Sequence, residues 1–152
     1  MWLELTENPN AASFFDLPPS LQDVEIFTIK IGRDGPTVEL AIALNEYPSS
    51  PPLRWRTYGA NAVVMTLQVT DLEHIELQGW STTNKVEIRI TRQDEARLEL
   101  VAEGGDFKMR AIFGFLHARG ETGSVARHIA AFCRVAAHAS EGNARRSANR
   151  AA

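Results

Sequence analysis

The fold is decided by residues 86–115, which read VEIRITRQDEARLELVAEGGDFKMRAIFGF. Apolar and polar residues alternate in three runs of this stretch, and a period of two is typical of β-strands because successive side chains point to opposite faces of a sheet. Gly104-Gly105 lies between two of the runs and predicts a hairpin turn. The apolar positions are Val86, Ile88, Ile90, Leu98, Leu100, Ala102, Phe107, Met109, Ala111, Phe113 and Phe115.

The same alternation extends towards the N-terminus. Residues 24–44 contain two alternating runs on either side of the turn sequence GRDGP at 32–36, which predicts a hairpin. In the first of these runs, Phe27, Ile29 and Ile31 are expected to share one face of the strand. Further strands are predicted within residues 61–70 and 75–79.

These patterns together predict about seven strands, and the short connections between them leave no room for the crossover helices that parallel strands need. We therefore expect a mainly β fold of the α+β class, with mostly antiparallel strands in one twisted sheet or an open sandwich. One face of the sheet is apolar and needs a second layer to cover it.

Helical structure is expected only at the two ends of the chain. Residues 2–15 predict a short helical segment, which Pro18-Pro19 ends. Ser124 is a suitable N-cap for a C-terminal amphipathic helix. Its apolar face would carry Val125, Ile129, Phe132, Cys133 and Ala136.

The chain of 152 residues is expected to form a single domain over residues 1–138, within which 117–138 form a helical extension. Residues 139–152 read ASEGNARRSANRAA and contain no apolar side chain larger than alanine. Such a segment buries too little surface to offset the entropy of ordering, so a disordered basic tail is predicted.

Charge divides the chain into an acidic body and a basic end. Residues 1–117 contain 17 acidic and 10 basic side chains, whereas residues 118–152 contain two acids and six arginines, which gives −7 and +4 within a net charge of −3. An acidic body repels phosphate, so no nucleic-acid partner is expected. The N-terminus lacks a basic and then apolar signal segment, so we expect a cytoplasmic protein without a membrane partner.

The sequence contains none of the common nucleophile, phosphate-loop or zinc-protease motifs. Cys133 is the only cysteine and is expected to be a small buried hydrophobe. No two of the four histidines, at 74, 117, 128 and 138, have the spacing of metal ligands. No enzymatic activity, cofactor or metal site is therefore predicted.

Several turns and strand ends together resemble the immunity protein 50 family of bacterial polymorphic toxin systems, over about residues 1–117. The residues are Trp2-Leu3, Asn8-Pro9, Pro19-Ser20-Leu21, Val24, Ile26, Arg33-Asp34-Gly35-Pro36-Thr37-Val38, Tyr47-Pro48, Pro51-Pro52, Arg54-Trp55 and Leu77-Gln78-Gly79-Trp80. The resemblance implies a cytosolic antitoxin that protects the cell by binding a cognate toxin domain, without enzymatic activity.

Solvent-side acids of the β region are the predicted contact surface, because an acidic domain can occupy the basic cleft of a toxin that attacks nucleic acid. Trp80 would serve as an aromatic anchor. The predicted partner-binding residues are Glu39, Glu46, Asp71, Glu73, Glu76 and Trp80.

Two other functions remain open at the level of sequence. One is a small-ligand-binding β module or small enzyme with a site between the sheet and the C-terminal helix. The other is a nucleic-acid accessory protein that acts through residues 139–152. A homodimer is one way to cover the edge strands of the sheet.

Overall fold

The computed structural model describes residues 1–9, 15–51, 53 and 63–120. Eight antiparallel strands form one sheet in the order β4-β7-β6-β5-β1-β2-β3-β8, preceded by the short 3-10 helix η1 (Trp2–Leu5). The strands are β1 (Val24–Gly32), β2 (Thr37–Ala43), β3 (Val64–Thr70), β4 (His74–Gln78), β5 (Lys85–Arg92), β6 (Leu98–Gly104), β7 (Phe107–Phe113) and β8 (Phe115–Gly120). The mainly β, antiparallel fold is confirmed, and of the helical segment expected within residues 2–15 the structure shows the single turn η1.

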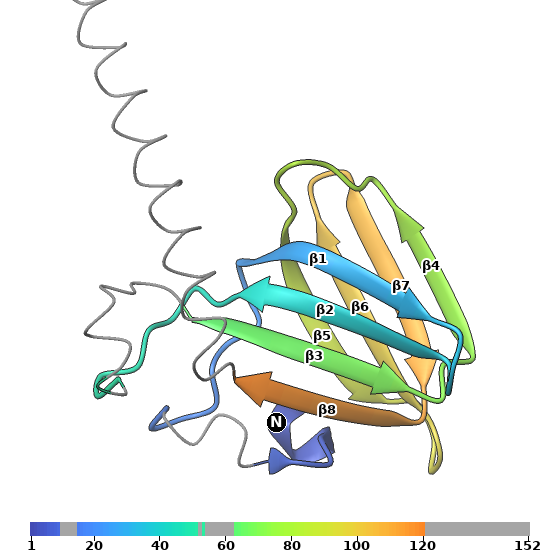
Figure 1. Cartoon of the computed structure of the whole chain (residues 1–152), viewed down its shortest axis with the longest axis horizontal. Coiled ribbons are helices and arrows are strands. Elements are labelled where there is room, and N and C mark those ends of the chain that lie inside the picture. Colours follow the sequence, from blue (N-terminus) through green and yellow to red (C-terminus); the bar gives the residue numbers. More distant parts are fainter. Residues whose placement is uncertain (10–14, 52, 54–62, 121–152) are drawn as a thin grey trace, which may run out of the picture.

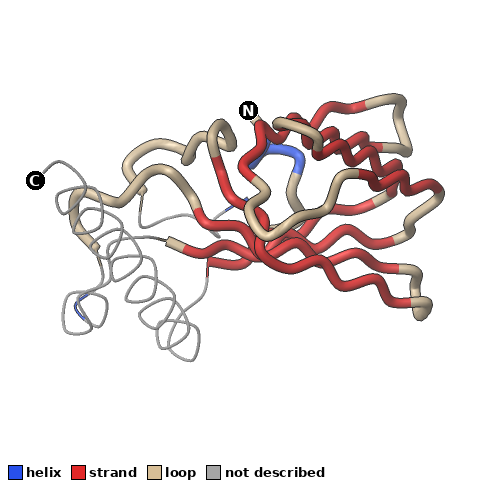
Figure 2. The backbone as a smooth tube through the Cα atoms, turned by 90° about the horizontal axis from the view of Figure 1, so that it is seen from above, coloured by secondary structure: helices blue, strands red, loops and turns tan. Residues whose placement is uncertain are grey.

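The sheet folds over on itself into two facing halves. Figure 1 shows the front half (β1, β2, β3 and β8) crossing over the back half (β5, β6, β7 and β4), and Figure 2 shows the arrangement from above. The halves are joined where β1 pairs with β5 over only two residue pairs, Val24 with Val86 and Glu25 with Lys85. The strands therefore form one continuous sheet, as in the first of the two expected architectures. This sheet makes two layers, as in the open sandwich that was the second.

The core lies between the two halves, where the apolar residues of the alternating runs meet. Register aligns them in rows across neighbouring strands, such as Leu40, Leu67 and Ala118 on β2, β3 and β8, all of which are buried. In the back half, Leu100 pairs with Ala111 and both are fully buried. Burial of apolar area at about 25 cal/mol per Å² makes these rows the main source of stability.

Asn84 adds hydrogen bonds between the two halves of the sheet, beside the short β1–β5 pairing. Its side chain is 4% exposed and donates to the carbonyls of Ile26 (3.3 Å) and Ser81 (2.8 Å), while its side-chain oxygen accepts from the Ser81 N–H (2.9 Å). The Ile26 N–H donates to the Asn84 carbonyl at 3.0 Å. Since Ile26 lies in β1 and Asn84 immediately precedes β5, these bonds extend the connection between the halves.

The expectation of about seven strands was wrong by one, because the alternation up to Phe115 spans two strands. Gly114 breaks the run: its N–H donates to the carbonyls of Thr70 (3.1 Å) and Asp71 (3.2 Å), and the chain passes there from the back half to the front half. Phe115 was expected on the buried face but is 50% exposed. After Gly114 the alternation of buried and exposed side chains is shifted by one residue, so Leu116, and not Phe115, points into the core.

The expected common face of Phe27, Ile29 and Ile31 was wrong for Phe27 alone, because Ile29 and Ile31 lie opposite the buried Leu40 and Val38 of β2. The β1–β2 register shifts between Ile26 and Thr28, so Phe27 is the extra residue of a β-bulge and falls out of the alternation. Ile29 packs against the core, but Ile31 at the end of the strand is 62% exposed.

The N-terminal segment covers the β8 edge of the sheet. Thr6 forms a parallel bridge with Leu116, and the Glu7 N–H donates to the Leu116 carbonyl at 2.8 Å. The Asn8 side chain bonds both backbone groups of Ala118, accepting from its N–H at 3.0 Å and donating to its carbonyl. Asn8 thereby replaces a strand partner at this edge.

The predicted C-terminal helix and the basic tail fall in residues 121–152, outside the described part of the chain. The first residues of the predicted helical extension, 117–120, belong to β8. Within the described residues, no helix has the length and apolar character needed to cross a membrane.

Candidate partner-binding surface

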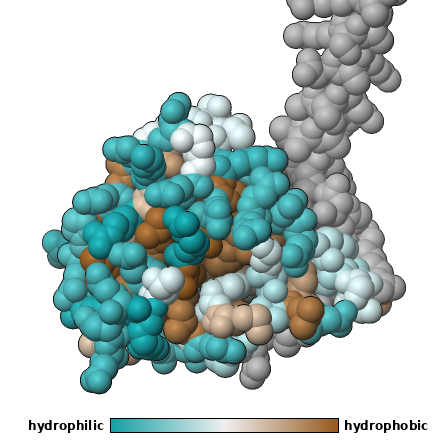
Figure 3. Space-filling view, turned by 180° about the vertical axis from the view of Figure 1, so that it is seen from behind, coloured by the Kyte–Doolittle hydropathy of each residue, from teal (hydrophilic) through white to brown (hydrophobic). Residues whose placement is uncertain are grey.

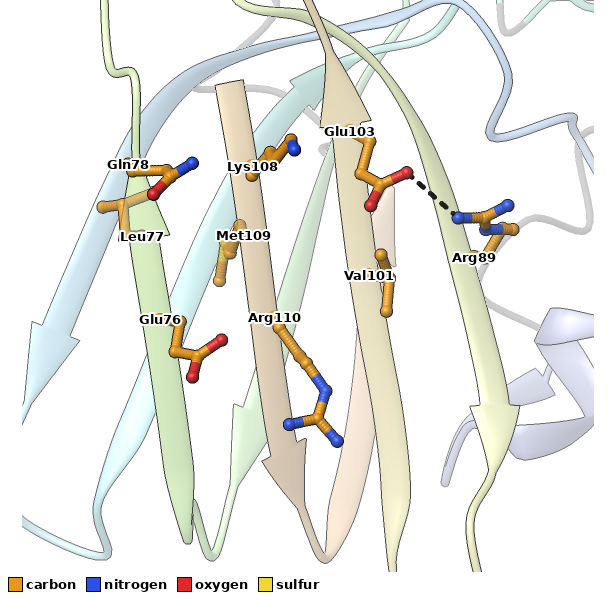
Figure 4. Close-up of a pocket in the computed structure, with 9 residues that line it drawn as sticks. All are labelled: Glu76, Leu77, Gln78, Arg89, Val101, Glu103, Lys108, Met109 and Arg110. Atoms are coloured by element: carbon orange, nitrogen blue, oxygen red, sulfur yellow. Dashed lines mark hydrogen bonds and ion pairs between the residues drawn. The ribbon is translucent and has the colours of Figure 1, made fainter. Parts of the chain in front are cut away.

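The outer face of the back half presents charged side chains in rows that run across four strands. Register places Glu76, Arg110, Val101 and Arg89 in one row from β4 to β5. Gln78, Lys108, Glu103 and Glu87 form the next row. A shallow hollow of about 800 Å³ lies over these rows, and Figure 4 shows the side chains that line it.

Figure 3 shows this face: hydrophilic side chains cover most of it, and hydrophobic ones gather near its middle. Two diagonal ion pairs fix the charges, Arg89 with Glu103 at 3.2 Å and Arg110 with Glu99 at 2.8 Å. Lys108 has no ion pair among the residues described. Exposed pairs of this kind each contribute only about 0–1 kcal/mol, so they orient side chains more than they stabilise the fold.

Three of the six predicted contact residues lie close together along one border of the back half. Asp71 and Glu73 belong to the β3–β4 connection, and both bind Arg97, at 2.8 and 2.7 Å. Glu76 follows on β4, with its carboxylate 3.0 Å from the His74 imidazole. Sequence reasoning found these acids but missed Arg97, which is distant along the chain.

The Arg97 guanidinium offsets one of the two negative charges of Asp71 and Glu73. Hydrogen bonding to Asp71 raises the pKa of Arg97, with the charges of Glu73 and Asp71 acting in the same direction against desolvation. Arg97 therefore stays protonated, and of the three neighbouring acids only Glu76 lies beyond its reach.

Trp80 lies just beyond the end of β4 and is 47% exposed. Its ring packs at 60° against Phe107, with centroids 6.0 Å apart. A second hollow of about 550 Å³ surrounds it and is lined in part by Gly79, Gly104 and Gly105. Gly79 has a φ of 77°, and a β-carbon there would lie 1.9 Å from the Asp106 carbonyl oxygen, so only glycine permits this approach.

The other two predicted acids lie elsewhere. Glu39 is on the outer face of the front half, where it is 3.3 Å from Arg119 of β8. Glu46 follows β2 and accepts a hydrogen bond from the Ser20 N–H at 3.3 Å. The structure thus gathers Asp71, Glu73 and Glu76 on β4 and its approach, with Trp80 at the far end, and separates Glu39 and Glu46 from them.

Of the histidines and the cysteine considered as catalytic or metal-binding residues, His74 and His117 are the two that lie in the described part of the chain. Cys133, His128 and His138 lie outside the described residues. His74 is on β4, whereas His117 pairs with Gln68 in the front half. In the described ranges, no group of three or more histidine, cysteine, aspartate or glutamate side chains is arranged to hold a metal ion.

Comparison with known proteins identifies a family for the chain. The family model for Immunity protein 50 matches residues 9–122, which are 114 of the 152 residues and include all eight strands. Neither the curated proteins nor the solved structures contain a match to the chain.

Proposed function

Because the chain belongs to the immunity protein 50 family, we propose that it is an antitoxin that binds and neutralises a cognate polymorphic toxin domain. Inhibition is non-covalent and non-enzymatic, and it takes place in the cytoplasm of the producing cell. The family match carries this proposal, since it covers the whole β fold.

The geometry of the back half supports a role in protein binding. Its side chains are held on a continuous sheet by cross-strand ion pairs, so little conformational entropy is lost when a partner docks. An exposed aromatic ring and the two arginines of a partly apolar face, Arg89 and Arg110, are residue types enriched at protein interfaces.

We place the contact surface along β4, from Asp71, Glu73 and Glu76 at its start to Trp80 beyond its end. The acids would steer a basic toxin to this border, and Trp80 would anchor it. Glu39 and Glu46 belong to a second, separate acidic area, which would contribute to steering at longer range.

The proposal is tested by expressing the C-terminal domain encoded by the reading frame immediately upstream, with and without this chain. We expect the toxin domain to arrest growth alone, and the full chain to restore growth and to co-purify with it. A variant that ends at residue 138 should protect equally well, because the acidic body and not the tail makes the contact. Growth arrest that persists with the chain present, together with no co-purification, would refute the proposal.

A further inference from the structure

The two terminal strands of the sheet, β8 and β4, differ in whether other parts of the described chain cover their outer edges. At the β8 edge, Thr6, Glu7 and Asn8 occupy the backbone groups that a further strand would use. At the other end of the strand order, β4 pairs with β7 on one side and with no described strand on the other. An open edge presents a row of backbone donors and acceptors to any extended segment that approaches.

β4 is short, but it lacks several of the features that protect an edge strand. Its sequence, HIELQ, has no proline and no lysine, and the described β4–β7 ladder is regular over all five pairs. The inward side chains are Ile75 and Leu77, opposite Ala111 and Met109, so no inward charge blocks an added strand. Leu77 is 41% exposed although its partner Met109 is buried, which leaves the rim of the core uncovered here.

From these features we infer that the toxin adds a strand to the β4 edge, which rests on the function proposed above. The added strand would place apolar side chains beside Ile75 and Leu77 on the inner face. On the outer face it would place a lysine or arginine beside Glu76, because oppositely charged cross-strand neighbours stabilise a sheet. The predicted toxin segment is thus an extended run of alternating apolar and basic residues.

A second copy of this chain fits the same edge less well. The antiparallel register that pairs all five residues of β4 with a second β4 places Glu76 opposite its own counterpart. Like charges directly opposite each other destabilise strand pairing. A basic strand from another protein removes this repulsion and adds an ion pair, which is why the toxin is the favoured occupant.

Backbone amide exchange tests the inference directly. In the complex of the full chain with the upstream-encoded toxin domain, the amides of residues 74–78 that exchange rapidly in the free chain should be slowed at least about tenfold, because they become hydrogen-bonded to the added strand. A complex that forms without slowing these amides would overturn the inference and leave the proposed function standing. A failure to form any complex would overturn both.

Two matched pairs of variants accompany the exchange measurement. Leu77→Lys places a charge on the inner side of the edge and should weaken toxin binding at least about 30-fold, whereas Leu17→Lys, at an exposed apolar position outside the strands, should not. Glu76→Lys should slow association several-fold, whereas Glu7→Lys, the same charge change at the exposed Glu7 beside the β8 edge, should not. Equal effects within each pair would refute strand addition at β4.

Amide exchange and mass measurements on the free chain distinguish a homodimer from the toxin as the occupant of the β4 edge. If its β4 amides are already protected, and this protection and a dimeric mass both disappear on dilution, the edge belongs to a homodimer and the inference is wrong. A monomer with rapidly exchanging β4 amides is the expected result.

Discussion

Replacement of Asn84 by alanine tests how the two halves of the sheet are held together. The buried Asn84 side chain makes three hydrogen bonds, two to Ser81 and one to the Ile26 carbonyl. A typical bond contributes about 0.5–1.5 kcal/mol, and a buried group left without a partner costs about 1–3 kcal/mol. The Ile26 carbonyl, on a fully buried residue, is the group least able to find water.

We therefore expect Asn84→Ala to lower the free energy of unfolding by about 2–4 kcal/mol, a large part of the 5–15 kcal/mol typical of a folded domain. At about 2–4 °C per kcal/mol for a chain of this size, the melting temperature should fall by about 10 °C. Urea unfolding measures the change, and the m-value should stay constant.

Asn45→Ala is the control, because Asn45 is exposed in the segment that follows β2. It should change the free energy of unfolding by less than about 0.5 kcal/mol. A loss below about 1 kcal/mol in Asn84→Ala would show that the short β1–β5 pairing and the core hold the halves together without this side chain.

Three further variants probe the backbone, the covered edge and the proposed surface. Gly79→Ala should lower the free energy of unfolding by more than about 3 kcal/mol, because the new β-carbon meets a backbone carbonyl. Gly35→Ala is the control, since Gly35 has a similar φ of 83° but open space around it, and should cost only about 1–2 kcal/mol. Equal losses in thermal unfolding would contradict the clash at Gly79. Asn8→Ala should accelerate amide exchange at residues 116–118 and lower the free energy of unfolding by about 1 kcal/mol, and unchanged exchange would show that the β8 edge is covered by other groups. Trp80→Ala should weaken toxin binding at least about 10-fold in a titration while costing only about 1 kcal/mol of stability, so unchanged affinity would remove Trp80 from the interface.

Local pattern was sufficient to predict most of the strands. The alternation at Val86, Ile88 and Ile90 follows the buried face of β5 residue by residue, because period two in sequence is period two in space. It was insufficient where the backbone breaks the period. The bulge at Phe27 and the turn at Gly114 depend on pairing partners and carbonyls elsewhere in the chain.

The candidate surface was predictable only in part for the same reason. Asp71, Glu73 and Glu76 are close in sequence, so their proximity followed from one extended segment. The ion pairs of Arg97 with Asp71 and Glu73 have no such local signal, because Arg97 lies in the β5–β6 connection and reaches the β3–β4 connection only in the folded chain. The protection of the β8 edge by Asn8, 110 residues from Ala118, has no local signal at all.

Titration of the toxin's activity with the purified full chain tests the central claim, that this protein inhibits by occupying its partner. A stoichiometric inhibitor predicts that activity falls linearly to an end point at one chain per toxin, and that the end point does not move with longer incubation. Loss of toxin activity at far less than one equivalent, increasing with time, would instead show catalytic inactivation and contradict the account.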